Sequence, residues 1–183
     1  MVNGPLVIPY AVANDGKAYT VTAIGDLAFN GAKGLTAITI PSSVKSIGNR
    51  AFDSCSKLTE ISIPQSLENI AGMAFARCNH LTKLTWNAVN CETDGKPFFN
   101  CPITELTIGD DVQCLPNSFL ALCTSLTDFT IPPSVTTIGA SAFDGCTSLT
   151  GVTIPNTVTS IGKYAFRDCQ MLLIRFTVPI TCT

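Results

Sequence analysis

Nine cysteines are the side chains of this 183-residue sequence that are best suited to chemistry. A thiolate is a nucleophile and a metal ligand, and two thiols can form a disulfide. Zinc sites need closely spaced Cys or His ligands that converge, and a spacing of about 23 residues along a rod does not converge. The spacing therefore argues against a metal site. Six of the nine cysteines recur at that spacing, at Cys55, Cys78, Cys101, Cys123, Cys146 and Cys169.

Catalysis by one of these thiols has little support either. A nucleophilic cysteine needs a nearby histidine that a third group orients. His80, two residues after Cys78, is the only histidine, and no third group accompanies it. Ala32 holds the equivalent position in the first repeat, so a small apolar side chain is sufficient there. We therefore predict a buried column of free thiols that act as small hydrophobic residues.

Two further cysteines, Cys91 and Cys114, lie outside the column but are also one period apart. Two alternatives stay open for them: a disulfide that staples this region, or two free thiols. A ninth cysteine, Cys182, has no partner in the repeat register.

Carboxylates and short motifs give no indication of an enzyme. Glu105 and Asp128 are a candidate acid–base pair, but they fall on an open strip rather than in an apolar pocket. No glycine-rich phosphate loop, G-x-S-x-G motif or H-E-x-x-H motif occurs. We predict no catalytic residue, no cofactor and no metal.

The composition excludes other classes of partner. The formal net charge is −2 and the eleven Lys and Arg are scattered, whereas nucleic acids and anionic membranes attract concentrated positive charge. No apolar run approaches the roughly 20 residues of a membrane-spanning helix, so we expect no membrane insertion. Residues 1–16 show neither the basic region nor the apolar region of a secretory signal.

The elements that position these residues follow from an internal repeat. Leu35–Ile40 (LTAITI) alternates apolar and hydroxylated residues, which predicts a half-buried strand, and Pro41 ends it. Glycines such as Gly48 and Gly139 are expected to permit a turn. The A-F-x-x-C segment has the spacing of a single helical turn. The register is marked by Phe29, Phe52, Phe75, Phe98, Phe119, Phe143 and Phe166.

One repeat cannot bury its apolar side alone, but stacked repeats bury it together. The sequence therefore predicts a mainly β fold, a right-handed parallel solenoid of about seven 23-residue coils. Each coil is expected to hold short strands and a single helical turn. Residues 1–183 are expected to form one domain.

The consensus L-T-x-I-T-I-P-x-S-V-x-x-I-G-x-x-A-F-x-x-C resembles the BspA-like leucine-rich repeats of bacterial surface proteins, over about residues 20–179. The resemblance implies a leucine-rich-repeat fold, export, location at the cell surface or outside the cell, and adhesion to proteins. No motif of the family encodes individual binding residues, so none is transferred to this chain.

The middle of the chain departs from the consensus, over about residues 87–118. Trp86 replaces an inward isoleucine, and the segment 87–97 lacks the V-x-x-I-G pattern. We expect an irregular coil with a protruding loop. The candidate binding residues of this loop are Asn87, Asn90, Glu92, Asp94 and Lys96. Residues from about 172 to 183 correspond to half a repeat.

The predicted concave sheet carries the other candidate binding residues, in two outward columns of its strands. Stacked hydroxyls also suit a parallel ladder without any ligand. Threonine rows are similar to those of ice-binding solenoids, but charged residues interrupt the array here. The candidate residues are Thr39, Glu60, Ser62, Lys83, Thr85, Glu105, Thr107, Asp128, Thr130 and Thr153.

We therefore predict a non-enzymatic binding or adhesion module of an exported or cell-surface protein. Its partner is expected to be an extracellular protein or glycan, of host or microbial origin, bound through the concave sheet or the irregular coil. The alternatives are a structural spacer of a larger surface protein and, more remotely, an ice-binding solenoid. The chain is expected to be a monomer or to associate end to end through its exposed solenoid edges.

Overall fold

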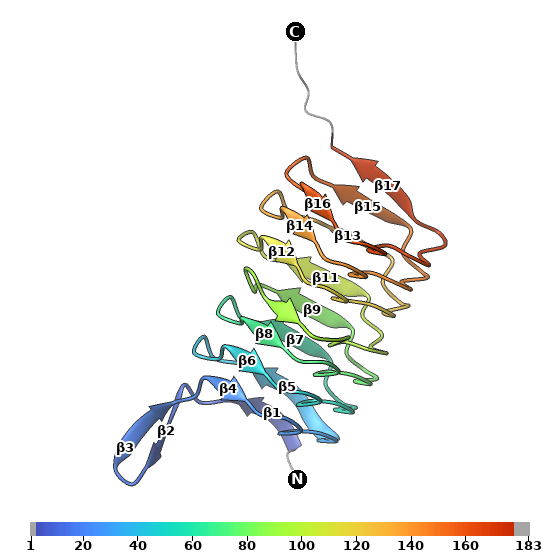
Figure 1. The fold of residues 1–183 in the computed structure, drawn as a ribbon. Coiled ribbons are helices and arrows are strands. Elements are labelled where there is room, and N and C mark those ends of the chain that lie inside the picture. The colour runs from blue at the N-terminus through green and yellow to red at the C-terminus, as the bar shows by residue number, and fades with distance from the viewer. Residues whose placement is uncertain (1–2, 178–183) are drawn as a thin grey trace.

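The computed structural model describes residues 3–177, and these form a parallel β-solenoid of about seven coils. Each coil passes through a long strand, a two-residue strand and a turn, so the solenoid has three sides (Figure 1). The long strands form the main sheet, and the two-residue strands form a lateral sheet. The third side, made of turns, is the turn face. The predicted fold class is confirmed.

The main-sheet strands are β1 (Asn3–Val7), β5 (Gly34–Thr39), β7 (Glu60–Ile63), β9 (Lys83–Trp86), β11 (Glu105–Ile108), β13 (Asp128–Thr130), β15 (Gly151–Ile154) and β17 (Leu173–Phe176). The lateral strands are β4 (Ala23–Ile24), β6 (Ser46–Ile47), β8 (Asn69–Ile70), β10 (Glu92–Thr93), β12 (Cys114–Leu115), β14 (Thr137–Ile138) and β16 (Ser160–Ile161). We number the coils in chain order. Coil 1 holds β1 and β4, coil 2 holds β5 and β6, and so on to coil 7 with β15 and β16, after which β17 follows.

Alternation along each long strand divides core from surface, as β7 shows. Ile61 and Ile63 are buried at 2% and 0% exposure, while Glu60 and Ser62 are exposed. Because successive side chains of a strand point to opposite faces, each coil adds two or three aliphatic side chains to one continuous core. Burying each of them contributes about 1.5–3 kcal/mol. The period-2 pattern of the sequence therefore predicted the strands correctly.

The ladders of both sheets are interrupted at specific coils. The main sheet consists of three hydrogen-bonded pieces, β1–β5, β7–β9–β11 and β13–β15–β17. The lateral sheet consists of two, β4–β6–β8–β10 and β12–β14–β16. The lateral break thus falls between coils 4 and 5, and the second break of the main sheet falls between coils 5 and 6.

The turn face contains no helix within residues 3–177, so the expected single helical turns are not present. In coil 2, Arg50 and Ser54 have positive φ angles of 53° and 63°. Their amides, with that of Phe52 between them, point along the solenoid and donate to coil 3 at 2.7–3.4 Å. The amides in between bond three residues back within the same turn. A turn with left-handed residues at Arg50 and Ser54 therefore replaces the helix, and it directs every second N–H to the next coil.

Two of the glycines that recur in the repeats are required for a different reason from the expected one. Gly48 and Gly139 do not adopt positive φ. A Cβ on Gly139 would lie 2.6 Å from the backbone nitrogen of Asn117, and one on Gly48 would lie 2.5 Å from that of Asp26. Glycine is required here because adjacent coils approach so closely, not because the chain turns.

An aromatic column runs through the core behind the turns. The rings of Phe29, Phe52, Phe75 and Phe98 stack with centroids 4.9–5.4 Å apart and planes within 9° of parallel. In coil 5 the equivalent position is held by Leu120 rather than Phe119. The Leu120 amide donates to Ala142 O in the same way as the Phe52 amide donates to Ala74 O. The sequence register is therefore wrong by one residue at Phe119, whose ring is displaced and meets that of Phe98 edge-on at 6.4 Å.

The segment 87–97 does not protrude, contrary to the expectation from its sequence. Ala88, Cys91 and Pro97 are buried, and Glu92–Thr93 pairs in parallel with Asn69–Ile70 as part of the lateral sheet. Small buried side chains keep the coil within the wall of the solenoid.

A hairpin at the N-terminal end is the element that does protrude (Figure 1). It consists of β2 (Ala11–Asn14) and β3 (Lys17–Thr20), paired antiparallel with Val12 opposite Tyr19. Asp15 and Gly16 form its turn with φ of 49° and 73°. An Asp-Gly pair between short extended segments is a known hairpin signal. At the other end, Pro179 and Cys182 lie outside the described residues.

Candidate functional site

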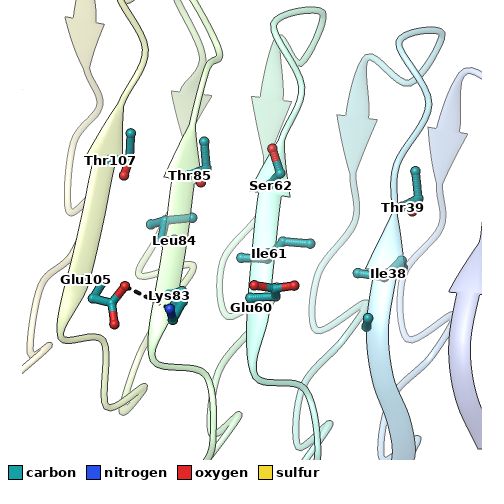
Figure 2. A pocket seen from close by; sticks show the side chains of 11 residues that line it. Ile38, Thr39, Glu60, Ile61, Ser62, Lys83, Leu84, Thr85, Glu105 and Thr107 are labelled. Carbon is teal, nitrogen blue, oxygen red and sulfur yellow. Dashed lines mark ion pairs between the residues drawn. The ribbon is translucent and has the colours of Figure 1, made fainter.

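The outward face of the main sheet, which we call the strand face, brings most of the predicted concave residues into two rows (Figure 2). Parallel register places Glu60 beside Lys83 and Lys83 beside Glu105. It also places the hydroxyls of Ser62, Thr85 and Thr107 side by side, two residues further along the same strands.

The rows continue beyond these three strands. Thr39 lies on β5 at the end of the hydroxyl row, while Thr130 pairs with Thr153 on β13 and β15. Asp128 pairs with Gly151, so its carboxylate has no charged neighbour on that side. All ten predicted residues therefore lie on one face, although the break between β11 and β13 separates the last three from the others.

The charged row contains one ion pair. Lys83 Nζ lies 3.0 Å from Glu105 Oε2, and both side chains are more than half exposed. Such a pair contributes little to stability in water, so both groups can exchange it for a ligand. Among the described residues, Glu60 and Asp128 form no ion pair.

The hydroxyl row is almost free of internal hydrogen bonds. Within residues 3–177, Ser62 is the only residue of this row whose hydroxyl bonds to another side chain: the side-chain amide of Asn87 donates to Ser62 Oγ at 3.5 Å. Shallow depressions follow the face, one of about 360 Å³ over β5 to β11 and one of about 500 Å³ at the break between β11 and β13. The face thus offers ordered hydrogen-bonding groups on an open, mostly polar surface.

The candidate loop residues are placed apart from these rows and are engaged in holding the coils together. Asn87 donates to Ile63 O at 3.2 Å, and Asn90 donates to Gln113 Oε1 at 3.0 Å. Asp94 accepts the Gly72 amide at 2.5 Å.

The last two candidates differ in burial and position. Glu92 is exposed in β10, and Lys96 is half-buried. The segment therefore connects neighbouring coils, and Glu92 and Asp94 are its exposed charged groups.

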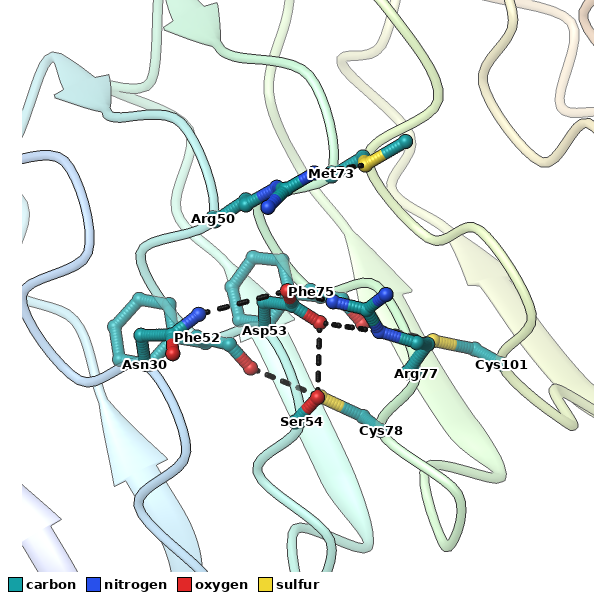
Figure 3. Close-up of polar contacts among 10 residues, drawn as sticks. All are labelled: Asn30, Arg50, Phe52, Asp53, Ser54, Met73, Phe75, Arg77, Cys78 and Cys101. Carbon is teal, nitrogen blue, oxygen red and sulfur yellow. Dashed lines mark hydrogen bonds and ion pairs between the residues drawn. The ribbon is translucent and has the colours of Figure 1, made fainter.

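The six column cysteines are free thiols packed behind the turns, as predicted (Figure 3). Cys78 Sγ donates to Phe52 O at 3.2 Å and Cys101 Sγ donates to Phe75 O at 3.0 Å, and the other column thiols repeat this contact. Each thiol thereby adds a weak hydrogen bond to the preceding coil, a role beyond filling space.

The surroundings of Cys55, Cys123 and Cys146 suppress the ionisation of these three thiols. Hydrogen bonding to the neighbouring thiol, followed by burial, raises the pKa of Cys55 far above its usual value. Burial raises the pKa of Cys146 to about 12 and that of Cys123 well above the usual range. A neutral thiol is a poor nucleophile, so Cys55, Cys123 and Cys146 are poorly reactive at neutral pH.

Cys91 and Cys114 are also free in the structure. Cys91 is buried, and burial with the nearby Cys114 raises its pKa to about 12. Cys114 is half-buried, and burial raises its pKa as well. A disulfide between them stays a prediction, which mass spectrometry of the unreduced protein tests directly.

Two buried carboxylates on the turn face were not anticipated. Asp53, with 1% of its side chain exposed, is paired with Arg77, whose Nε donates to Oδ1 at 3.0 Å and whose terminal nitrogen contacts Oδ2 (Figure 3). Asn30 and Ser54 donate to the same carboxylate at 3.5 and 3.1 Å. The available signal was the aspartate that follows A-F in two repeats only.

The second pair is Asp144 with Arg167, joined by Nε to Oδ1 at 2.8 Å. Within residues 3–177 no group of three or more His, Cys, Asp or Glu could hold a metal ion. No helix of that part of the chain is long and apolar enough to cross a membrane. Both buried ion pairs connect adjacent coils.

Large exposed apolar side chains occur only at the two ends of the described solenoid. At the N-terminal end they include Tyr10, Val12 and Tyr19 of the hairpin region, at 47–61% exposure. The middle coils expose no large apolar side chain, so the strand face between the ends is mostly polar.

Comparison with known proteins agrees with this geometry. The sequence matches the family described as BspA type Leucine rich repeat region (6 copies), over residues 17–123 and 91–175. No curated protein matches significantly.

Solved structures show the same fold. A leucine-rich repeat protein from Bacteroides ovatus is 32% identical, with a TM-score of 0.72 over 96% of this chain and 45% of its own. The leucine-rich repeat protein of T. pallidum is 28% identical, with a TM-score of 0.60 over 96% and 70%. A leucine rich cell surface protein from Faecalibacterium prausnitzii is 23% identical, with a TM-score of 0.58 over 98% and 61%. The chain thus spans less than two thirds of the Bacteroides and Faecalibacterium chains.

Proposed function

This chain belongs to the BspA type leucine-rich repeat family, and we propose that it is a non-enzymatic binding module of an exported or cell-surface protein. It binds a protein or glycan through the strand face. One observation carries the proposal: two rows of exposed hydroxyl and charged groups, nearly free of internal partners, lie on a rigid parallel ladder. Such a pre-organised surface loses little conformational entropy when a ligand binds.

The similar structures support the location. The Faecalibacterium prausnitzii protein is described as a cell surface protein, and it shares this fold along most of the present chain. Repeat proteins commonly use their extended sheet face to bind other macromolecules. These likenesses favour a surface-exposed binding module over a catalytic domain.

The charge distribution favours a neutral or cationic partner surface. Residues 97–162 contain five Asp or Glu and no Lys, Arg or His. Two of these acidic residues, Glu105 and Asp128, lie on the strand face. Complementary charge accelerates encounter and selects among partners.

An array of extracellular matrix proteins and glycans, probed with the purified chain, tests the proposal. We expect saturable binding that Asp128→Lys weakens about tenfold, equivalent to about 1.4 kcal/mol. Glu92→Lys is the matched control, because Glu92 is exposed on the lateral sheet. Binding that is lost with Glu92→Lys and retained with Asp128→Lys would move the site to the lateral side. No binding to any class of ligand would favour a structural spacer.

A further inference from the structure

On the turn face, backbone amides of one coil donate to carbonyl groups of the next coil, and we call these bonds the turn ladder. The turn ladder links every pair of adjacent coils in the described solenoid except coils 4 and 5. At the intact interface between coils 5 and 6, the amides of Ser118, Leu120 and Leu122 donate to coil 6 at 2.7–2.8 Å. Two amides of coil 3 donate to coil 4 in the same way. Within residues 3–177, no such bond joins the Phe98 turn of coil 4 to the Leu120 turn of coil 5.

The lateral sheet and the aromatic column are also interrupted at this interface. The lateral sheet breaks between β10 and β12. The parallel stacking of the aromatic column ends at Phe98 and resumes only with Phe143 and Phe166, 5.4 Å apart and 8° from parallel. The thiol contact across this interface, from Cys123 Sγ to Phe98 O, is the longest of the column at 3.5 Å.

The main sheet, in contrast, is continuous there. β9 and β11 pair over four residues, from Lys83 opposite Glu105 to Trp86 opposite Ile108. The Gly109 amide extends this ladder by donating to Trp86 O at 2.9 Å.

On the lateral side, the amides of Gln113 and Cys114 still donate to Val89 O at 3.0 and 3.2 Å, and Asn90 and Thr93 add side-chain bonds to Gln113 and Asn117. The interface is therefore held by the main sheet and by these lateral bonds, whereas no backbone bond crosses its turn side within residues 3–177.

We propose that this interface is a hinge. The β9–β11 ladder is its axis, and the turn side opens, so that coils 1–4 and coils 5–7 move as two rigid blocks. The stability of a repeat protein is a sum of coil and interface terms, so an interface without backbone bonds across its turns opens on that side at the lowest cost. Opening changes the curvature of the strand face at its middle. The hinge is a property of the chain alone and does not depend on the proposed ligand.

Trp86 provides a reporter at the axis. Its side chain is fully buried against Phe119, with ring centroids 4.8 Å apart, and its indole N–H has no acceptor among residues 3–177. A buried donor without a partner gains a hydrogen bond to water when the interface opens. The orphan N–H thus stabilises the open state relative to the closed one.

Native-state hydrogen exchange of the whole chain tests the hinge. The amides of Cys101 and Cys146 are matched, because each donates three residues back, to Phe98 O at 3.1 Å and to Phe143 O at 3.2 Å. After correction for intrinsic rates, we expect the Cys101 amide and the Trp86 indole to exchange at least about tenfold faster than the Cys146 amide. Equal exchange of all three through global unfolding would overturn the proposal.

A variant that restores the consensus provides the second arm. Phe119→Ala combined with Leu120→Phe recreates the S-A-F sequence of coil 6 and fills the aromatic column. We expect it to slow Cys101 exchange to within about threefold of Cys146. Phe52→Leu, at an intact interface, is the control and leaves Cys101 exchange unchanged. If the double variant does not fold, acrylamide quenching of Trp86 fluorescence in the native chain is the deciding measurement. A quenching rate constant as low as that of a tryptophan in a permanently closed core contradicts the hinge.

Discussion

Replacing Arg77 with alanine should destabilise the solenoid more than the loss of a surface residue would suggest. The guanidinium is 47% exposed, but the Asp53 carboxylate that it pairs with is only 1% exposed. Alanine removes the cation and leaves a buried negative charge. Arg77 has a φ of 57°, and alanine keeps the cost of that conformation because it also carries a Cβ. The substitution therefore isolates the ion pair.

The magnitude follows from what remains around Asp53. Removing one partner of a buried ion pair typically costs about 3–5 kcal/mol. Here the Arg77 side is open to water, and Asn30 and Ser54 still donate to the carboxylate at 3.5 and 3.1 Å. We therefore expect a loss of about 2–3 kcal/mol in the free energy of unfolding, or about 4–12 °C in Tm.

Urea denaturation followed by circular dichroism measures this loss. Arg77→Lys should retain part of the stability, because it keeps the charge but not the two-pronged geometry. The double variant Asp53→Asn with Arg77→Ala should be more stable than Arg77→Ala alone, since no buried charge is left unpaired. A loss below about 0.5 kcal/mol for Arg77→Ala, the range of exposed pairs, would refute the reasoning.

Three further outcomes follow from the packing. Gly139→Ala should lower stability by about 1–3 kcal/mol in urea denaturation, because its Cβ would lie 2.6 Å from Asn117 N. Two residues later, Ser141→Gly should raise stability by about 1 kcal/mol in the same assay, since Ser141 has a φ of 55°. Burial raises the pKa of both Cys91 and Cys146 from 9.0 to about 12, so the unfolded state loses these protons first. The contribution of these thiols to the free energy of unfolding should be fully present below about pH 9. Between about pH 9 and pH 12 it should fall by about 1.4 kcal/mol per pH unit for each thiol, and a constant free energy of unfolding across that range would contradict the burial.

Much of the fold was readable from the sequence because the repeat encodes it redundantly. Alternating segments such as Leu35–Ile40 predicted the strands, and five of the six column thiols are buried as predicted, whereas Cys169 is half-buried. The errors arose where chain geometry overrides residue identity. Phe119 matches the pattern, but the hydrogen bonds between coils 5 and 6 place Leu120 in the aromatic column. Spacing alone suggested helical turns, whereas the need to bond the next coil selects left-handed residues such as Arg50.

The candidate site was predictable only in part. Strand periodicity predicts which side chains point outward, so residues such as Glu60 and Thr107 were placed on one face. The pairing between coils was not predictable, because the contacts of Asp53 with Arg77 depend on side chains 24 residues apart. The segment 87–97 was expected to protrude, but its side chains Asn87, Asn90 and Asp94 form hydrogen bonds to neighbouring coils. The hairpin was missed because it interrupts the repeat.

The two buried ion pairs also bear on how near-identical coils find their correct neighbours during folding. In coil 2 and coil 6 the aspartate directly follows the aromatic residue, at Asp53 and Asp144. Their arginines differ in position: Arg77 lies 24 residues on, whereas Arg167 lies 23 residues on. A coil that docked against the wrong copy would satisfy its apolar contacts but leave a carboxylate buried without its cation. Each pair therefore discriminates against misregistered stacking, which a chain of uniform repeats would otherwise tolerate.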